Sequence, residues 1–443
     1  MVFPPVFREP ELGSYLYIGI DIGTSGCRAV AIDESDKVVA EASSAFPQSV
    51  VDGDCITQQP QDWWLALEHS LTWLVRQIDA SKAVAVAVDG TSSTILLSDA
   101  TGNPLTPGFM YNDARARVEA NEIASQCPGH SGAQGATSGL AKLIWMHRHG
   151  LDKQARHVLS QADWIAGRLC GIYGSSDWNN ALKLGFDAVE KKWPEWISRV
   201  AINPGLLPEV HGPGETLGAL SPDIANHFGL PGTTLVKFGT TDSIAAFIAA
   251  GANRPGQAVT SLGSTLVLKL LAEKPVFSAE HGVYSHRLGN YWLAGGASNS
   301  GGAVLLQHFT LEQIQQMTPK LQPETPVNLD YYPLPGTGER FPVNDANLPS
   351  RIEPRPDDPV QFFQALLEGI ASIELQGYQL LQQLGAGYPD EVFTSGGGAT
   401  NAGWSRIRQR LLGVPVRSAQ SVDAAVGAAK LARGHFESKK VDT

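Results

Sequence analysis

The 443-residue chain contains few cysteines, and they are not clustered. Cys27, Cys55, Cys127 and Cys170 are scattered and form no Cys-x-x-Cys pair, so the sequence offers neither a disulfide framework nor a cysteine-ligated metal site. We expect all four to pack as small apolar side chains in a reducing compartment.

Positive charge and long apolar runs are also scarce. The net charge of −11 argues against broad binding to nucleic acid or to an anionic membrane surface. No apolar run approaches the roughly 20 residues that a membrane helix needs. Neither nucleic acid nor a membrane is therefore an expected partner, and the sequence does not indicate an oligomeric state.

Residues 1–15 lack the basic and apolar segments of a secretory signal, and we expect a loose N-terminal arm there. The expected location is the cytoplasm, or the plastid stroma if the source is a plant or an alga. Whether a transit segment has been removed stays open.

The composition is that of a folded protein. Hydrophobic residues make up 43% of the chain and charged residues 17%, which is typical of globular rather than disordered proteins. A chain of 443 residues is too long for one ordinary core, so we expect two domains.

The stretch at residues 16–33 is predicted to form a strand, a tight turn and a second strand. Asp21 ends the first strand, and residues 23–26 (Gly-Thr-Ser-Gly) supply the turn. Such a turn presents several backbone N–H groups to one point and can cradle a phosphate. A carboxylate beside it suits Mg²⁺, which proteins usually hold with one or two carboxylates plus substrate phosphates. The alternative is an ordinary hairpin with a polar turn.

The same pattern returns in the second half of the chain. Residues 257–262 and 266–271 are predicted strands joined by a Gly-Ser-Thr turn at 263–265. Two halves that begin alike predict a duplicated architecture, and two such turns facing each other could hold one polyphosphate from both sides.

Two more predicted strands end in polar residues. The run AVAVAV at residues 83–88 leads into Asp89-Gly-Thr-Ser-Ser93, and a strand at 236–242 ends in Gly239-Thr-Thr-Asp242, directly before an apolar helix. Open α/β sheets bind ligands at the carboxyl ends of their strands. A carboxylate at a helix N-terminus is also favoured electrostatically, so simple capping by Asp242 or Ser243 is the structural alternative.

Two further segments are polar. Residues 176–185 (SDWNNALKLG) indicate either a helix start capped by Asp177 or Asn179 or a hydroxyl-rich ligand edge, and the spacing favours the cap. A strand at 391–394 is followed by Gly396-Gly-Gly-Ala-Thr-Asn401, where bare backbone would let a flat ligand lie close. There Asn401 would cap the next helix or contact the ligand.

Taken together, Asp21-Ile-Gly-Thr-Ser25, Gly239-Thr-Thr-Asp242, Ser261-Leu-Gly-Ser-Thr265 and Gly396-Gly-Gly-Ala-Thr-Asn401 resemble, in order and spacing, the motifs of the FGGY carbohydrate kinases. The resemblance covers about residues 16–435. It implies an α/β fold of two RNase H-like domains with a central cleft, as in the superfamily of sugar kinases, hexokinase, heat-shock ATPases and actin.

The implied division of the chain has four parts. These are an N-terminal arm (1–15), a first domain with the sugar site and first phosphate site (16–250), a second domain on the nucleotide side (251–422), and a last segment (423–443) whose helix would pack back on the first domain before a polar tail.

The resemblance also implies ATP and Mg²⁺ as cofactors and assigns roles to residues. Asp242 matches the catalytic base and Asp21 the carboxylate that holds Mg²⁺; both would touch the sugar, as would Ser92. The residues implied to bind ATP are Gly23, Thr24 and Ser25 at one phosphate turn, Gly263, Ser264 and Thr265 at the other, and Gly396, Gly397, Gly398 and Asn401 beside the adenosine.

Within the family, Asp89-Gly-Thr-Ser92 and residues 176–185 and 282–286 are most similar to the D-ribulose kinases of cyanobacteria and plants, once labelled xylulose-kinase-like. The Gly-Gln-Met-His-Gly segment of bacterial xylulose kinases is absent, and Asp89-Gly-Thr-Ser-Ser93 stands in its place. The implied reaction is phosphorylation of a terminal hydroxyl of a pentulose, converting D-ribulose to D-ribulose 5-phosphate. The alternatives are a kinase for D-xylulose or another ketose or polyol, and a weakly catalytic regulator that binds nucleotide and sugar.

Overall fold

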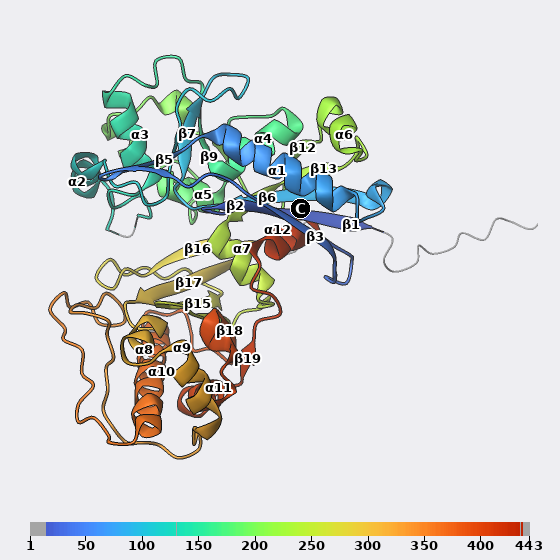
Figure 1. The fold of residues 1–443 in the computed structure, drawn as a ribbon. Helices are drawn as coiled ribbons and strands as arrows, with labels where there is room; N and C mark the ends of the chain where they lie inside the picture. The colour runs from blue at the N-terminus through green and yellow to red at the C-terminus, as the bar shows by residue number, and fades with distance from the viewer. Residues whose placement is uncertain (1–14, 130, 435, 437–443) are drawn as a thin grey trace, which may run out of the picture.

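The computed structural model describes residues 15–129, 131–434 and 436. The expected N-terminal arm, except for Tyr15, and most of the expected polar tail lie outside the described residues. Within the described residues the chain forms two α/β units, each built on a six-stranded mixed sheet, which lie one above the other in Figure 1. The two-domain α/β fold predicted from the sequence is confirmed.

The first sheet has the strand order β12-β13-β6-β1-β2-β3. Its strands are β1 (Leu16–Ile22), β2 (Gly26–Ile32), β3 (Val38–Ala45), β6 (Ala83–Gly90), β12 (Thr216–Ala219) and β13 (Leu235–Thr241). The opening strands pair antiparallel, whereas β6 lies parallel between β1 and β13. Because parallel strands point the same way, the carboxyl ends of β1, β6 and β13 meet at one edge of the sheet.

Helices and a smaller sheet complete the first unit. Helix α1 (Pro60–Val75) buries its tryptophans Trp63 and Trp64 against the first sheet, so these aromatic residues belong to the core, as their helical spacing predicts. The other helices are α2 (Arg117–Gln126), α3 (Gly139–Arg148), α4 (Gln161–Cys170), α5 (Trp178–Ala181) and α6 (Pro222–Phe228). The smaller strands are β4 (Val50–Asp52), β5 (Cys55–Gln58), β7 (Ile95–Ser98), β8 (Gly108–Phe109), β9 (His157–Ser160), β10 (Ser175–Asp177) and β11 (Glu209–His211).

The second sheet repeats the design of the first, with the order β16-β17-β15-β14-β18-β19. Its strands are β14 (Gln257–Leu262), β15 (Leu266–Ala272), β16 (Tyr284–Leu288), β17 (Tyr291–Ser298), β18 (Glu391–Ser395) and β19 (Val416–Ser418). In each sheet the first two strands, β1 and β2 or β14 and β15, form an antiparallel hairpin. The first strand of the hairpin pairs on its other side with a later parallel strand, β6 or β18. The duplication expected from the two Gly/Ser/Thr turns is therefore present in the strand order.

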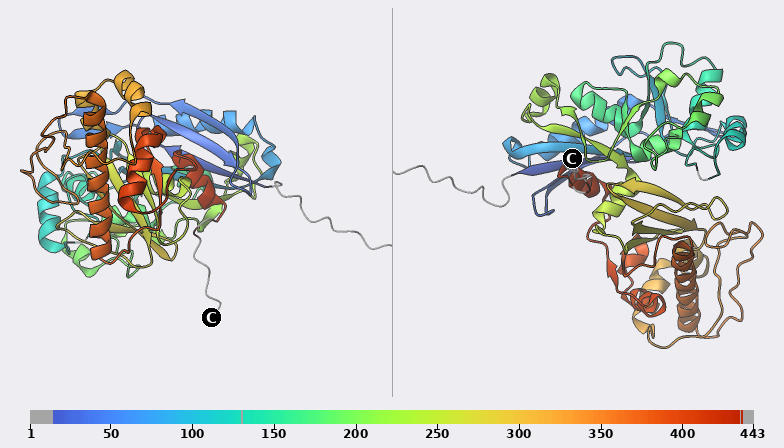
Figure 2. Two further views of the ribbon diagram at one scale, coloured as in Figure 1. Left: turned by 90° about the horizontal axis from the view of Figure 1, so that it is seen from below. Right: turned by 180° about the vertical axis from the view of Figure 1, so that it is seen from behind.

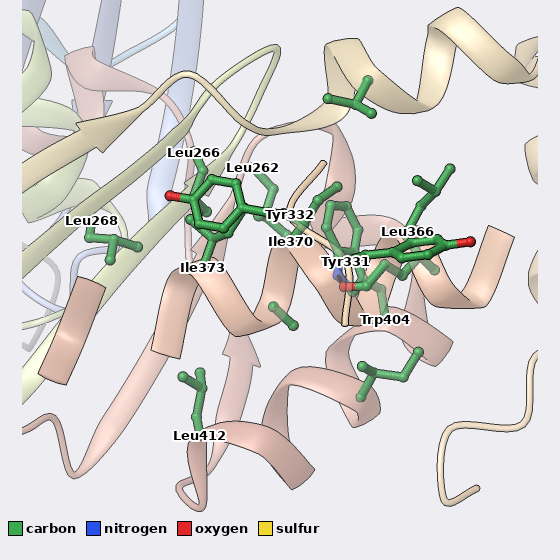
Figure 3. Close-up of a cluster of buried hydrophobic side chains, with 14 of the residues drawn as sticks. Leu262, Leu266, Leu268, Tyr331, Tyr332, Leu366, Ile370, Ile373, Trp404 and Leu412 are labelled. Carbon is green, nitrogen blue, oxygen red and sulfur yellow. Dashed lines mark hydrogen bonds between the residues drawn. The ribbon is translucent and has the colours of Figure 1, made fainter. Parts of the chain in front are cut away.

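One face of the second sheet is covered by helices. These are α8 (Gly302–His308), α9 (Leu311–Met317), α10 (Pro359–Gln383) and α11 (Ala402–Leu412). Figure 3 shows how Leu366 and Ile370 of α10 lie between the strand residue Leu266 and Trp404 of α11. The segment between α9 and α10 contributes Tyr331 and Tyr332 to this core.

Helices α7 (Asp242–Ala249) and α12 (Ala424–Ala432) lie between the two sheets. In Figures 1 and 2, α12 lies beside the blue strands of the first unit, away from the other red segments of the second. Close backbone contact makes this possible. A Cβ atom added to Gly19 of β1 would be 1.9 Å from the Ala425 carbonyl oxygen, and one added to Gly427 would be 1.8 Å from that of Ala245.

The polar segment at 176–185 begins with a capped helix, as the spacing favoured. Asp177 is the N-cap of α5 and accepts hydrogen bonds from the backbone N–H groups of Asn179 (2.8 Å) and Asn180 (3.3 Å). The four cysteines are free thiols, and Cys27 is buried. Across the described residues, no helix has both the length and the apolar character needed to span a membrane.

The close contact between β1 and α12 gives a stability prediction. Gly19→Ala should lower the free energy of unfolding by about 1–3 kcal/mol, because its new methyl group would overlap backbone atoms of α12 that cannot move independently. Urea denaturation followed by circular dichroism would measure the change. The matched control is Gly232→Ala, whose Cβ would meet no atom within 4 Å. Equal denaturation midpoints for the two variants would contradict this account of the packing.

Candidate functional site

Three carboxylates come together at the edge where β1, β6 and β13 end. Asp21 of β1 is in register with Asp89 of β6, and Asp89 is in register with Thr240 of β13. Asp242 follows directly as the first residue of α7, and Thr241, the N-cap residue, makes no side-chain cap bond. Asp242 Oδ1 instead accepts the N–H of its neighbour Ser243 at 2.6 Å. The fold thus brings Asp21 and Asp242 together, although they lie far apart in the chain.

Several polar atoms at this edge have no partner. Asp21 Oδ1, both carboxylate oxygens of Asp89, Ser92 Oγ and Thr241 Oγ1 are buried without a partner among the described residues when the carboxylates are ionised; a proton on Asp89 would let it donate to Asp21. Buried polar atoms in native proteins are nearly always hydrogen-bonded, so such a cluster indicates a place where a ligand supplies the missing partners. A polyhydroxylated molecule can supply both donors and acceptors.

The surroundings of the three carboxylates favour their protonated forms. Burial raises the pKa of Asp21 to about 6, and the charge of Asp242 contributes to the increase. Burial and the neighbouring Asp21 hold the pKa of Asp89 well above its ordinary value. Burial also raises the pKa of Asp242, while the Ser243 N–H and the ammonium group of Lys269 oppose the increase. A bound cation or donor ligand would relieve this electrostatic cost.

The carboxylate pair also fits a magnesium ion. Mg²⁺ takes oxygen ligands and usually binds through one or two carboxylates together with substrate phosphates. The unpartnered oxygens of Asp21 and Asp89 supply ligands of this kind. Within the described ranges no group of three or more His, Cys, Asp or Glu side chains could hold a metal ion. Waters and phosphate oxygens of the substrate would complete the coordination.

The first Gly/Ser/Thr turn lies beside Asp21. The Gly23 N–H donates to the Gly26 carbonyl oxygen at 3.0 Å, and Gln58 Nε2 donates to the Thr24 carbonyl oxygen at 2.9 Å. These bonds hold the shape of the turn, while Thr24 and Ser25 remain exposed. The turn is therefore a fixed loop with accessible hydroxyl groups at the same sheet edge as the carboxylates.

The second turn joins β14 to β15 and is fixed in a similar way. The Gly263 N–H donates to the Thr265 carbonyl oxygen at 3.2 Å, and the Gly263 carbonyl oxygen accepts the Gly302 N–H at 2.8 Å. Ser264 is exposed. The turn is thus bonded to the start of α8, with the Ser264 hydroxyl open to solvent.

A cavity of about 500 Å³ lies next to this second turn. Five of the residues predicted to bind ATP line it: Gly263, Ser264, Gly397, Gly398 and Asn401. Leu306, Ile314 and Trp404 supply apolar walls. A cavity with glycine backbone on one side and apolar side chains on the other is suited to a flat heterocycle. Thr265 and Gly396 do not line the cavity, although Gly396, at φ +81°, forms the bend that leads into it.

Asn401 has a structural role at this cavity. Its Oδ1 accepts the Trp404 N–H at 2.9 Å, which caps α11, and its Nδ2 donates to Thr318 Oγ1 at 3.3 Å. The helix cap expected at this position is therefore present. The side chain lines the cavity with its polar groups already bonded to protein.

Two residues of the carboxylate cluster were not among the predicted site residues. Asp89 could have been predicted from the sequence, because it comes at the end of an apolar strand directly before a glycine, much as Asp21 comes near the end of β1. Lys269 is the one charged residue of β15, and its ammonium group reaches the carbonyl oxygen of Ser243, next to Asp242. Burial lowers the pKa of Lys269 to about 8, and Asp242 opposes this change. That contact links the second sheet to α7, a pairing that no local pattern indicates.

Comparison with known proteins identifies both halves of the chain. Residues 16–249 match the N-terminal domain of the FGGY family of carbohydrate kinases, and residues 258–433 match the C-terminal domain of the same family.

Curated relatives with similar sequences are named as xylulose kinases. The protein from Escherichia coli (strain K12) is 26% identical over 437 residues, covering 94% of this chain and 90% of the relative. That from Streptomyces coelicolor is 28% identical, covering 95% of this chain and 88% of the relative.

Solved structures show the same fold. A xyloylose kinase from Brucella ovis superposes with a TM-score of 0.85 at 24% identity, covering 96% of this chain and 93% of the other. A xylulose kinase from Rhodospirillum rubrum gives 0.83 at 25% identity, covering 94% and 89%. Because the two family models together span nearly the whole described chain, the protein belongs to the FGGY family of carbohydrate kinases and is an ATP-using sugar phosphotransferase.

Proposed function

We propose that this kinase phosphorylates the terminal hydroxyl of a pentulose and that D-ribulose, which gives D-ribulose 5-phosphate, is its substrate. The observation that carries the pentulose proposal is the set of unpartnered polar atoms on Asp21, Asp89 and Ser92 at one sheet edge. They offer several hydrogen-bonding groups to a small polyol. D-Ribulose is preferred because the segment at residues 89–93 resembles that of D-ribulose kinases.

D-Xylulose is the second candidate substrate. It is favoured by the names of the relatives, which are xylulose kinases that match along most of their length. The two sugars differ in the configuration of one carbon atom. Such epimers are distinguished strongly when buried polar groups lose their partners in the wrong complex. The buried oxygens of Asp89 and Ser92 are placed to exert this kind of discrimination.

In the proposed mechanism Asp242 acts as the general base. Its carboxylate takes the proton from the terminal hydroxyl as the sugar oxygen bonds to the γ-phosphorus of ATP and the bond to the leaving ADP breaks. Phosphoryl transfer depends mainly on in-line positioning and on stabilisation of charge. We assign the positioning of the terminal phosphate to the turns at 23–25 and 263–265, and that of the adenosine to the cavity beside residues 396–401.

The role proposed for Asp21 is to hold Mg²⁺, with Asp89 beside it. When bound, Mg²⁺ would neutralise charge on the phosphate oxygens. The same proposal divides the chain into a first domain at 16–250 and a second at 251–422, with the helix of the last segment returning to the first domain. Contact between α12 and β1 supports this division.

Substrate identity is tested by ADP release with Mg-ATP and a panel of D-ribulose, L-ribulose, D-xylulose, glycerol and no sugar. We expect the highest kcat/KM for D-ribulose and little ADP release without sugar. A higher kcat/KM for D-xylulose would replace the ribulose proposal with the xylulose one. ADP release that no sugar stimulates would contradict both and favour the regulator.

Substitution of the proposed base should separate catalysis from binding. Asp242→Asn should lower kcat by about 10²–10⁴-fold, since general-base catalysis contributes a factor of this order, and leave the dissociation constant for ATP nearly unchanged. Steady-state kinetics and calorimetric titration with ATP measure the two effects. Asp223→Asn, an exposed aspartate in the first turn of α6, is the control. Turnover near the wild-type value would remove Asp242 from the base role.

The acidic side of the pH profile should reflect Asp21 together with Asp242, because both carboxylates must be ionised and burial raises the pKa of each. The Asp21 carboxylate must be ionised to hold a cation, and burial raises its pKa to about 6, so kcat/KM should decline as the pH falls through about 6. An unperturbed aspartate would maintain activity to about pH 4. Asp21→Ala should abolish Mg²⁺-dependent activity at every pH. Activity that persists to about pH 4, or a Mg²⁺-dependent rate in Asp21→Ala close to wild type, would show that Asp21 is structural.

A further inference from the structure

A second cavity lies at the second sheet. Its volume is about 330 Å³, and it is lined by residues of β15, β16 and β17, by the loop before β16 and by Arg340. It shares no lining residue with the cavity beside the second turn. The predicted ATP-binding and sugar-binding residues are also absent from its walls. The cavity is therefore distinct from the predicted ATP-binding and sugar-binding residues, although it shares Lys269 with the carboxylate cluster.

The lining of this cavity carries positive but no negative charge. Its polar side chains are those of Lys269, His281, Tyr284, His286 and Arg340, and its other walls are apolar residues and glycines. Two acidic residues adjoin lining residues in the sequence. Glu339 is buried and accepts the Asn299 N–H at 2.8 Å, whereas Glu280 is exposed to solvent. In a chain with a net charge of −11, such a cavity is a local site for an anion.

The side chain of His286 indicates that the ligand of this cavity is polar. The residue is only 9% exposed, it lines the cavity, and its side chain has no hydrogen bond to any described residue. Burial, together with the charges of Lys183 and Lys269, holds its pKa well below the ordinary value, so the imidazole is neutral. A neutral imidazole has one N–H donor and one acceptor. Both ring nitrogens therefore remain available to a polar ligand in the cavity.

Arg340 supplies a positive charge that could bind an anion. The residue is exposed at the mouth of the cavity, and its guanidinium group has no partner among the described residues. Guanidinium groups bind phosphate through two parallel hydrogen bonds, a geometry that an ammonium group cannot match. Lys269, by contrast, already donates to the Ser243 carbonyl oxygen.

We propose that this cavity binds a small phosphate monoester, with Arg340 holding the phosphate and His286 donating to it. The volume lies at the lower end of the range for ligand sites, which suits a molecule the size of a sugar phosphate rather than a nucleotide. The ester could be the product of the proposed reaction or another phosphorylated metabolite. Because Lys269 lines the cavity and also contacts the residue after Asp242, a bound ester would lie one side chain away from the proposed base. The relation between the bound ester and the base rests on the proposed function, whereas the proposed phosphate-binding site does not depend on it.

Calorimetric titration of the full chain, without ATP or sugar, tests the site directly. The probes are inorganic phosphate and D-ribulose 5-phosphate, which separate recognition of phosphate alone from recognition of the ester. Binding of either should be about tenfold weaker in Arg340→Met, since a charge-assisted hydrogen bond is lost. Arg351→Met, which removes an exposed arginine paired with Asp330, is the control and should bind like wild type.

A second variant and a competition experiment distinguish this cavity from the nucleotide site. His286→Leu should also weaken binding. Binding should persist when Mg-ADP occupies the nucleotide site. Absence of binding, equal affinity in Arg340→Met and wild type, or complete displacement by Mg-ADP would overturn the proposal. Because none of these titrations needs turnover, a chain inactive on D-ribulose would still give a clear result.

Discussion

Close backbone contact at the centre of the molecule determines where the functional groups lie. Gly19 and Gly427 have no side chain, and this lets α12 pack against both β1 and α7. Atoms of a helix and a strand that approach so closely leave little freedom for relative movement. The contact places α7, which begins with Asp242, in a fixed position next to the strand that ends near Asp21. The geometry of the carboxylates therefore depends on residues that carry no chemistry themselves.

The carboxylate cluster has an electrostatic cost in the free protein. Three acidic groups share one edge of a sheet, two of them in register, and burial raises the pKa of each. Such an arrangement is stable only because the surrounding sheet and helices enforce it. Binding of a cation and a polyol would relieve both the charge repulsion and the missing hydrogen bonds. In the proposed function, this cost would favour the liganded state over the empty one.

The second sheet takes part in the proposed function in two ways. Gly263 and Ser264 of its turn border the cavity of about 500 Å³ together with the glycines at 397–398, and Lys269 contacts α7. This lysine connects the cavity proposed to bind a phosphate ester with the residue next to the proposed base. A change in the relative position of the two units would alter that contact. Domain movement is common in enzymes that must exclude water from a transferred phosphate.

Local pattern in the sequence determined the elements and many of the candidate groups. Alternating apolar runs ending in Asp21 and in Asp242 marked strands and their carboxyl ends, and the helix at Ala424–Ala432 was recognisable from its small residues. Pairing between distant segments was decided only in the tertiary structure. The register of Asp21 with Asp89 depends on a parallel pair whose strands lie far apart in the chain, and parallel neighbours leave no local signal. For the same reason the sequence did not predict the contact of Lys269 with Ser243 or the surroundings of His286. Burial and charge depend on which surfaces meet, and that is a property of the whole fold.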